Sequence, residues 1–245
     1  LHSFPTRRSS DLHIDTGEIL ADGGQVLLTA SAANDVIARA VNNDGVIRAA
    51  RVDNTGGRIR LVGPEGTVVN NGTLDATGVG AASSGGEVQV LGDRVELTGT
   101  SLVDVSGSAG GGTALIGGSF RGEDPAVLNA QRTDVQAGAV IKADSTLSGD
   151  AGRVAVWADG TTVFHGDILA RATGSEGNGG YAEISGKEHL GVGGDIRLES
   201  TSGAAGTLLL DPGTVTITSG GDTAPPASLT IWRSEERRVG KECRS

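Results

Sequence analysis

Cysteine, methionine and aromatic residues are almost missing from this sequence of 245 residues. Cysteine occurs once, at Cys243, methionine does not occur, and Phe, Trp and Tyr make up 2% of the chain. A lone cysteine cannot form an intramolecular disulfide, and one thiolate is not a metal site. With so few aromatic rings, we expect a core of small and β-branched side chains.

Long apolar runs and excess positive charge are also missing. No stretch approaches the 18 or so consecutive apolar residues of a membrane-spanning helix, so no membrane insertion is predicted. The formal net charge is −10 at pH 7. Because an acidic surface repels phosphates and anionic lipid headgroups, nucleic acid is not an expected partner.

The two ends of the sequence can be encoded by complementary strands of the same DNA. When residues 233–245 (RSEERRVGKECRS) are back-translated with permitted codons, the complementary strand in a shifted frame reads LHSFPTRRSSDL, which is residues 1–12. Protein ends have no physical reason to be complementary as DNA, and the shared DNA resembles a sequencing-library adapter. We therefore interpret 1–12 and 233–245 as artefacts and leave them out of the fold argument.

Removal of the ends makes the remaining sequence more acidic. The first segment holds two arginines and one aspartate, and the last holds five basic and three acidic residues, so 13–232 keeps 13 basic and 26 acidic residues, a net charge of −13. The only cysteine is lost with the tail. The Arg-rich ends therefore do not indicate a nucleic-acid patch or a localisation signal.

Glycine is abundant, with 41 residues, and it marks an internal repeat. A pair of small residues followed by an alternating apolar run begins at Gly23, Gly56, Gly85, Gly111, Ala151, Gly179 and Ala205. Counted along the sequence, the intervals between successive starts are 33, 29, 26, 40, 28 and 26. A period of about 20 to 50 residues is typical of stacked repeat architectures.

Each repeat contains three short apolar pieces. A second piece precedes the small pair and begins at Gly17, Gly45, Gly72, Ser101, Ala139, Gly166 and Gly194. A shorter piece, such as DRVELTG from Asp93, lies between the two. Each unit therefore reads as three strands separated by Gly, Asn or Asp turns, with Val88 and Val90 pointing inward.

Strands of four or five residues cannot bury a core alone, but stacked coils can. We predict an all-β fold, a parallel β-helix with three-strand coils and Gly-rich turns, in which equivalent strands pair about 4.8 Å apart. Seven to nine coils predict a rod of roughly 35 to 45 Å. The predicted shaft covers 13–220, and 221–232 begins a next segment or linker.

Several motifs carry a family resemblance. The run ILADGGQVLLTASAANDVI, the VNNDGVIRA and LDATG segments, VDVSGSAGGGTALIGG and the closing GAAGTLLLDPGTVTI are similar to exoproteins of the filamentous haemagglutinin family. The resemblance covers most of 13–232 and implies a right-handed β-helix, secretion to the bacterial cell surface, and an outer-membrane two-partner secretion transporter as partner. The family's Asn-Pro-Asn motif does not occur, so we expect the transporter-binding segment to lie outside this fragment.

No catalytic, cofactor-binding or metal-binding residues are predicted. His13, His165 and His189 lack ligand spacing, and the GSEGNGG loop from Gly174 lacks a calcium-repeat pattern. GGSFRG from Gly117 and SSGG from Ser83 miss the spacing of a nucleophile motif. The prediction is therefore a protein that is not an enzyme and needs no cofactor.

Three further features are expected to have structural or surface roles. Asp75 and Asp104 occupy similar places in successive units and are expected to share a face, where solvation is the simplest role for them. Trp157 and Phe164 are expected to form a stacking plug near a corner. The irregular insertion 119–136 interrupts the repeat, and as a loop protruding from the shaft it is the preferred place for a contact surface, although an insertion without a partner remains open.

The leading functional hypothesis is a structural and adhesive shaft. It would project a distal segment of a large secreted adhesin and contact host or neighbouring cells. A carbohydrate-active β-helix enzyme is the alternative, and it requires carboxylates that converge in one groove. The shaft of a contact-dependent inhibition toxin is a third hypothesis, which this fragment cannot separate from an adhesin.

Overall fold

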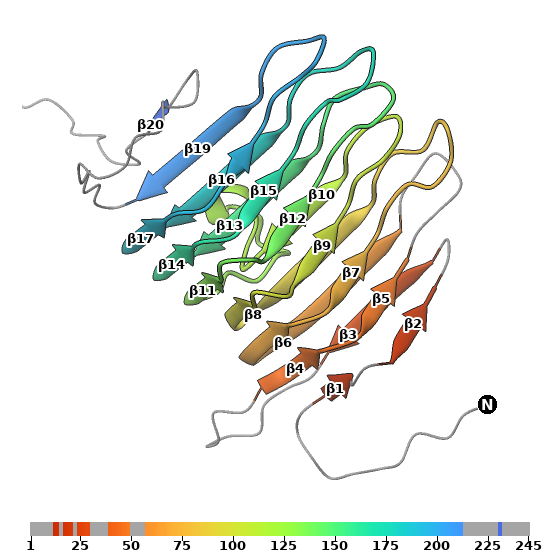
Figure 1. Cartoon of the computed structure of the whole chain (residues 1–245). Helices are drawn as coiled ribbons and strands as arrows, with labels where there is room; N and C mark the ends of the chain where they lie inside the picture. The colour runs from red at the N-terminus through yellow and green to blue at the C-terminus, as the bar shows by residue number, and fades with distance from the viewer. Residues whose placement is uncertain are drawn as a thin grey trace, which may run out of the picture.

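The chain winds into a stack of parallel coils (Figure 1). The computed structural model describes residues 12–14, 17–21, 24–29, 39–49, 57–212 and 230–231. Within them, every strand pair is parallel, and the one helical segment is the short 3-10 helix η1 (Phe120–Gly122). The predicted all-β parallel β-helix is confirmed.

The coils have three sides, as predicted. Side 1 contains β3 (Gln25–Thr29), β10 (Thr113–Ile116), β13 (Arg153–Ala158), β16 (Tyr181–Gly186), β19 (Thr207–Pro212), β20 (Thr230–Ile231) and the first parts of β6 (Arg58–Asn70) and β8 (Glu87–Leu97). Side 2 contains β1 (Leu12–Ile14), β4 (Arg39–Asn43), β11 (Arg132–Val135), β14 (Thr161–Phe164), β17 (His189–Val192) and the second parts of β6 and β8. Side 3 contains β2 (Glu18–Leu20), β5 (Val46–Arg48), β7 (Thr73–Asp75), β9 (Leu102–Asp104), β12 (Val140–Lys142), β15 (Asp167–Leu169) and β18 (Ile196–Arg197).

The strand register of side 1 coincides with the sequence repeat. The residues two positions after the start of each small pair form one continuous ladder, namely Gln25, Arg58, Glu87, Thr113, Arg153, Tyr181 and Thr207. The intervals between these residues are the intervals between the small pairs. The small pairs therefore mark one structurally equivalent corner in successive coils.

Strand length differs from the predicted four or five residues on all three sides, with only two or three residues in each strand of side 3, and it differs most in two coils. β6 has 13 residues and β8 has 11, instead of four or five, because each runs from side 1 into side 2 without leaving the sheet. Their register shifts between Gly63 and Thr67, where β6 holds more residues than β8. This irregularity lets the continuous strand bend around the corner while its flanks stay paired.

Aliphatic columns fill the interior. Side 3 contributes one inward residue per strand, namely Ile19, Ile47, Leu74, Val103, Ile141, Ile168 and Ile196. On side 1, Val88 and Val90 are fully buried, as predicted. Gln89 points outward between them, yet only 7% of it is exposed, so the outer face of side 1 is covered in part.

A column of glycines forms the corner between sides 3 and 1. A Cβ at Gly86 would lie 2.0 Å from the carbonyl oxygen of Gly57, and a Cβ at Gly112 would lie 2.0 Å from that of Gly86. Both distances are far below van der Waals contact. Close approach of stacked backbones, rather than an unusual φ angle, therefore requires glycine here.

Polar side chains enter the interior at two places, one at a corner and one on side 2. The fully buried Asn43 donates from Nδ2 to Oδ1 of Asn70 at 2.7 Å, and Asn70 donates to the carbonyl oxygen of Gly72 at 3.0 Å. In the next coil the same position is taken by Leu97. On side 2, the buried hydroxyl of Thr133 donates to the carbonyl oxygen of Trp157 at 2.7 Å. Each of these buried polar groups thus finds a backbone or side-chain partner.

In the part of the chain that the structure describes, side 3 has seven strands and side 1 has eight, from β3 to β20. At about 4.8 Å per interval these sides are about 29 Å and about 34 Å long, and the predicted length was roughly 35 to 45 Å. The segments interpreted as artefacts lie outside the described residues, apart from Leu12, the first residue of β1. Of 221–232, Thr230 and Ile231 form β20, which pairs with β19. Among the described residues, no helix has the length and hydropathy needed to cross a bilayer.

Candidate functional site

The predicted insertion lies at the corner between sides 1 and 2. β10 ends at Ile116 and β11 begins at Arg132, whereas β13 and β14 of the next coil are separated only by residues 159 and 160. Residues 117–131 therefore form the insertion, called the strap below. The predicted range 119–136 was wrong at its end, because Thr133 and Val135 of β11 point inward and are buried.

The strap was expected to protrude from the shaft. Instead, it lies over the outer face of side 1. Its backbone reaches β16, where the amide of Arg121 donates to the carboxylate of Glu183. It turns sharply to do so: Gly117, Arg121 and Gly122 all have left-handed backbones, with φ of 78°, 57° and 62°. Arg121 is the one non-glycine residue with a positive φ in the described part of the chain. Such a conformation is unfavourable for a residue with a Cβ and needs compensating contacts.

Trp157 forms the floor under the strap. A Cβ at Gly118 would lie 2.6 Å from Cδ1 of the indole, and one at Gly122 would lie 2.6 Å from its Cε2. The indole is 4% exposed and donates from Nε1 to Asp159 Oδ1 at 3.1 Å. Trp157 therefore lies outside the coil and under the strap, so it is no internal plug. Phe164, by contrast, is fully buried in the interior, as predicted.

A cationic and aromatic cluster fixes the strap to the next two coils. The guanidinium of Arg153 lies over the ring of Phe120, with Cζ 4.2 Å from the ring centroid, and 5.4 Å from the centroid of Tyr181. The two rings are 5.6 Å apart and tilted by 58°. Because Phe120 belongs to the strap, Arg153 to β13 and Tyr181 to β16, three successive coils meet at this cluster.

Glu183 is a fully buried carboxylate on the outer side of β16. The Arg121 amide donates to its Oε1 at 3.0 Å and to its Oε2 at 3.2 Å, and the Ser185 hydroxyl donates to Oε1 at 3.1 Å. Burial raises the pKa of Glu183, the Asp211 carboxylate raises it further, and the hydrogen bonds from Arg121 and Ser185 oppose this. Alternation along β16 predicts that this residue is solvated, so no local pattern signals its burial.

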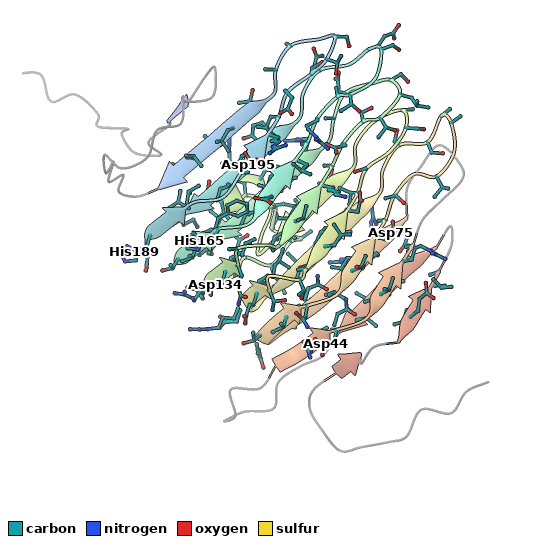
Figure 2. The ribbon with its side chains drawn as sticks, in the orientation of Figure 1. Asp44, Asp75, Asp134, His165, His189 and Asp195 are labelled. Carbon is teal, nitrogen blue, oxygen red and sulfur yellow. The ribbon has the colours of Figure 1, made fainter. Side chains whose placement is uncertain are left out.

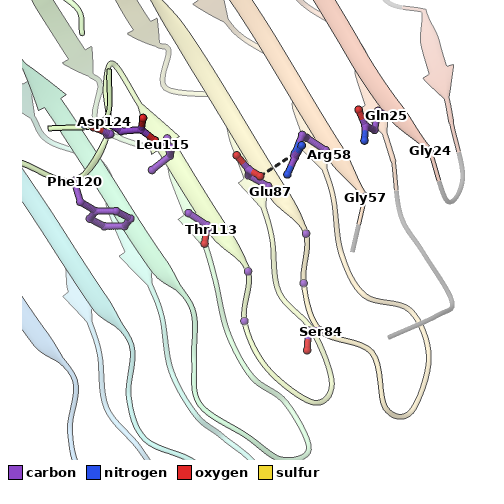
Figure 3. A pocket seen from close by; sticks show the side chains of 15 residues that line it. Gly24, Gln25, Gly57, Arg58, Ser84, Glu87, Thr113, Leu115, Phe120 and Asp124 are labelled. Atoms are coloured by element: carbon purple, nitrogen blue, oxygen red, sulfur yellow. Dashed lines mark hydrogen bonds and ion pairs between the residues drawn. The ribbon is translucent and has the colours of Figure 1, made fainter. Parts of the chain in front are cut away.

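A groove runs beside the strap along side 1 (Figure 3). Its volume is about 790 Å³, and its lining includes the corner glycines of successive coils. Gln25, Arg58, Glu87 and Thr113 line its floor, and Phe120 belongs to its lining at the strap. Arg58 donates from Nε to Glu87 at 2.8 Å, so the two central charges neutralise one another.

Side 2 holds like charges in register. Arg94 of β8 lies beside Arg132 of β11, and Glu96 of β8 lies beside Asp134 of β11. The repulsion between these like charges is reduced within β11, because Arg132 binds Asp134 through Nε and Nη2, both at 2.6 Å. This bidentate contact raises the pKa of the Arg132 guanidinium. The hollow beside these residues has a volume of about 410 Å³ and includes His165.

The histidines and acidic residues that were weighed as site candidates are spread along the molecule (Figure 2). His165 and His189 are both exposed and belong to side 2, while the side chain of His13 lies outside the described part. Among the described residues, no group of three or more His, Cys, Asp or Glu side chains is placed to hold a metal ion.

Ser119, the serine of the GGSFRG motif, is buried, and its hydroxyl accepts a hydrogen bond from the amide of Asp124 at 3.0 Å.

Asp75 and Asp104 share a face, as predicted. They are direct partners in the ladder of β7 and β9. The ladder continues on either side with basic residues, because Arg48 of β5 pairs with Asp75 and Lys142 of β12 pairs with Asp104. Oδ1 of Asp75 accepts the amide of Thr77 at 3.0 Å, and Oδ1 of Asp104 accepts that of Ser106 at 2.9 Å. Each carboxylate therefore stabilises the turn that follows its own strand.

Comparison with known proteins finds a structural neighbour. The fold is similar to the crystal structure of the HMW1 secretion domain from Haemophilus influenzae, with a TM-score of 0.55 and 24% sequence identity. The match covers 77% of this chain and 48% of that one, so this chain spans about half its length. No protein-family profile and no curated protein matches the sequence. At this identity, the likeness shows a shared fold.

Proposed function

We propose that this chain is a stiff shaft segment of a large, secreted bacterial exoprotein that resembles filamentous haemagglutinin. The shaft holds a distal segment away from the cell and offers its outer sides for contact with host or neighbouring cells. Export by a two-partner secretion transporter follows from the sequence resemblance. Similarity of fold to a bacterial secretion domain supports a secreted protein.

The observation that carries this proposal is the continuous ladder of side 1. Seven strands, from β3 to β19, stay in one register although the coil from Thr113 to Arg153 is much longer than its neighbours. Extra residues are placed at corners, and the stack itself is not interrupted. A fold whose length varies with the number of repeats, and whose cross-section does not, suits a spacer.

The outer charges also support a structural role. Several carboxylates bind a basic side chain of the same or the neighbouring coil: Asp144 with Arg171, Asp134 with Arg132, Glu87 with Arg58, Asp159 with Lys187, and Asp195 with Arg197. A glycoside hydrolase needs two carboxyl groups, one as acid and one as base or nucleophile, that face the same substrate. The carboxylates of these ion pairs are instead distributed over the three sides.

Deletion of one whole coil tests the proposal. Residues 85–110 are one complete repeat, because Gly85 and Gly111 begin successive small pairs, so their removal joins Ser84 to Gly111 in register. The shortened parent protein is expected to fold and to be shorter by about 4.8 Å, measured by small-angle scattering. Deletion of 85–97 alone, half of this repeat, breaks the register, serves as the control and should abolish folding. Loss of a chemical activity, with the rod otherwise intact, contradicts a shaft.

The alternative, a carbohydrate-active enzyme, has one specific observation in its favour. Asp75 and Asp104 are adjacent carboxylates on one face. Incubation of the chain with acidic polysaccharides, followed by detection of new reducing ends, tests it. Cleavage that disappears in Asp75→Asn and Asp104→Asn variants, both still folded, would replace the shaft by an enzyme.

A further inference from the structure

The first part of the strap is attached to two later coils. In a solenoid each repeat normally contacts only its neighbours. The Arg121 amide donates to the carboxylate of Glu183 on β16, and the Phe120 ring lies 5.6 Å from the ring of Tyr181, also on β16. The guanidinium of Arg153, on β13, lies over both rings. The strap therefore contacts the coil that follows its own and also the coil after that.

The last part of the strap is linked to the same two coils. Asn129 donates from Nδ2 to Oδ1 of Asp159 at 3.4 Å. The same oxygen binds Nζ of Lys187 at 2.6 Å, and this ammonium group lies 5.6 Å from the ring centroid of Trp157. Asp159 follows β13 and Lys187 follows β16 in the sequence. A chain of polar contacts therefore connects three successive coils at this end too.

The outer polar contacts of earlier coils on side 1 join direct neighbours. Arg58 donates to Glu87, and Arg60 donates to Gln89, both at 2.8 Å. Both pairs connect β6 with β8, which are partners in the ladder. Such contacts stabilise one interface between two coils. They do not make the folding of one coil depend on a coil further along the stack.

The contacts of the strap exist together only while all three coils are folded. If β16 opens, Arg121 loses the acceptor that helps to hold its left-handed backbone, with φ of 57°, and Phe120 loses the ring of Tyr181. The strap is then held less firmly over β13 and Trp157. If the coil of β10 opens, the strap leaves, and β13 and β16 lose these contacts at once. Opening of one coil therefore destabilises the other two.

We propose that the strap makes the coils of β10, β13 and β16 one cooperative unit, called the strap unit, that opens as a whole. β10 begins at Thr113 and β19 at Thr207, so the strap unit covers 113–206 and holds 94 residues. A stack of repeats with contacts between neighbours only can open coil by coil from its ends. Unravelling that starts at either end therefore stops at the strap unit. This property goes beyond the proposed shaft function and does not depend on it.

Hydrogen exchange of the full chain at low urea concentrations tests the proposal. We expect the amides of β10, β13 and β16 to share one opening reaction, with the same free energy and the same dependence on urea. The amides of β6, nearer the end of the stack, should open at a lower free energy and with a smaller urea dependence. Separate openings of β10 and β16, or one opening that β6 shares as well, overturn the proposal.

A double variant removes the links between the strap and β16. Tyr181→Thr and Glu183→Ala introduce the side chains found at the same ladder positions in neighbouring coils, at Thr207 of β19 and Ala155 of β13. The amides of β16 should then open separately from those of β10 and exchange at least about tenfold faster than they do. A common opening of β10, β13 and β16 that persists in this variant overturns the proposal.

The matched control is the double variant Arg58→Thr, Arg60→Ala. It changes the same two ladder positions in β6, whose side-chain contacts with β8 do not involve the strap. Exchange should become faster in β6, while the common opening of the strap unit stays unchanged. If the control also separates β10 from β16, weakening of side 1 as a whole explains the effect, and the proposal is wrong.

Mechanical unfolding of the unmodified chain is independent of these variants. When the full chain is pulled from its two ends in an optical trap, the strap unit should open in one step that releases its 94 residues. That step corresponds to roughly 300 Å of extended chain. The same measurement decides the matter if the Tyr181→Thr, Glu183→Ala variant does not fold. A series of shorter steps, each the length of one coil, also overturns the proposal.

Discussion

The backbone amide of Arg121 donates to both carboxylate oxygens of Glu183, at 3.0 and 3.2 Å, across 62 positions of the sequence. Ladder partners in this fold are one coil apart, as for Thr113 and Arg153 or Arg153 and Tyr181. The Arg121 contact instead spans two coils. It also helps to hold Arg121 in a left-handed conformation, with φ of 57°, which a residue with a Cβ adopts at a cost of about 1 kcal/mol or more.

Gly112→Ala is expected to destabilise the coil strongly. Its Cβ would lie 2.0 Å from the carbonyl oxygen of Gly86, and backbone atoms cannot move away without breaking the ladder. We expect the free energy of unfolding to fall by about 2 to 3 kcal/mol, measured by urea denaturation. Gly191→Ala is the matched control, because no other atom lies within 4 Å of its Cβ position. Equal stability of the two variants would contradict the close-packed corner.

The buried Asn43 and Asn70 are expected to be coupled. Asn70→Leu leaves the Nδ2 group of Asn43 without its acceptor and should lower the free energy of unfolding by about 1 to 3 kcal/mol. Leucine fits the column, since Leu97 occupies the same position in the next coil. The double variant Asn43→Leu, Asn70→Leu should therefore cost less than the sum of the two single variants in a double-mutant cycle. Simple additivity would argue against the pair.

Phe120→Ala is expected to loosen the strap without unfolding the stack. The substitution removes the ring that contacts Arg153 and Tyr181. The amides of Arg121 and Gly122 should exchange at least about tenfold faster, whereas those of β9 keep their protection. Leu128→Ala, in the same strap but 40% exposed, serves as control and should change little. Global loss of protection would mean that the strap is part of the core.

Arg171→Lys is expected to weaken a partly buried ion pair. Arg171 binds Asp144 through Nη2 at 2.7 Å and Nε at 3.2 Å, and the Asp144 side chain is 10% exposed. Lysine cannot make this two-pronged contact, so the free energy of unfolding should fall by about 0.5 to 1 kcal/mol, and less at high salt. Arg197→Lys, at the exposed pair with Asp195, should have no measurable effect. A cost independent of salt would point to packing instead.

Local sequence patterns are enough to define the coil. The small pairs and the apolar pieces that follow them recur at unequal intervals, and the same intervals separate the ladder residues of side 1. Inward positions such as Val88 and Val90 were also readable, because alternation along a strand is a local property. The glycine corners followed for the same reason, since small residues recur there from coil to coil.

The position of the strap, and what it covers, depends on tertiary contacts instead. Residues 117–131 occur once, so no repeat constrains them, and their partners Arg153, Trp157, Tyr181 and Glu183 come from two later coils. Alternation assigns Glu183 to the solvent side of β16, and it is buried because a distant segment crosses it. Local patterns fix which way a side chain points, but the path of a unique segment depends on contacts tens of residues away.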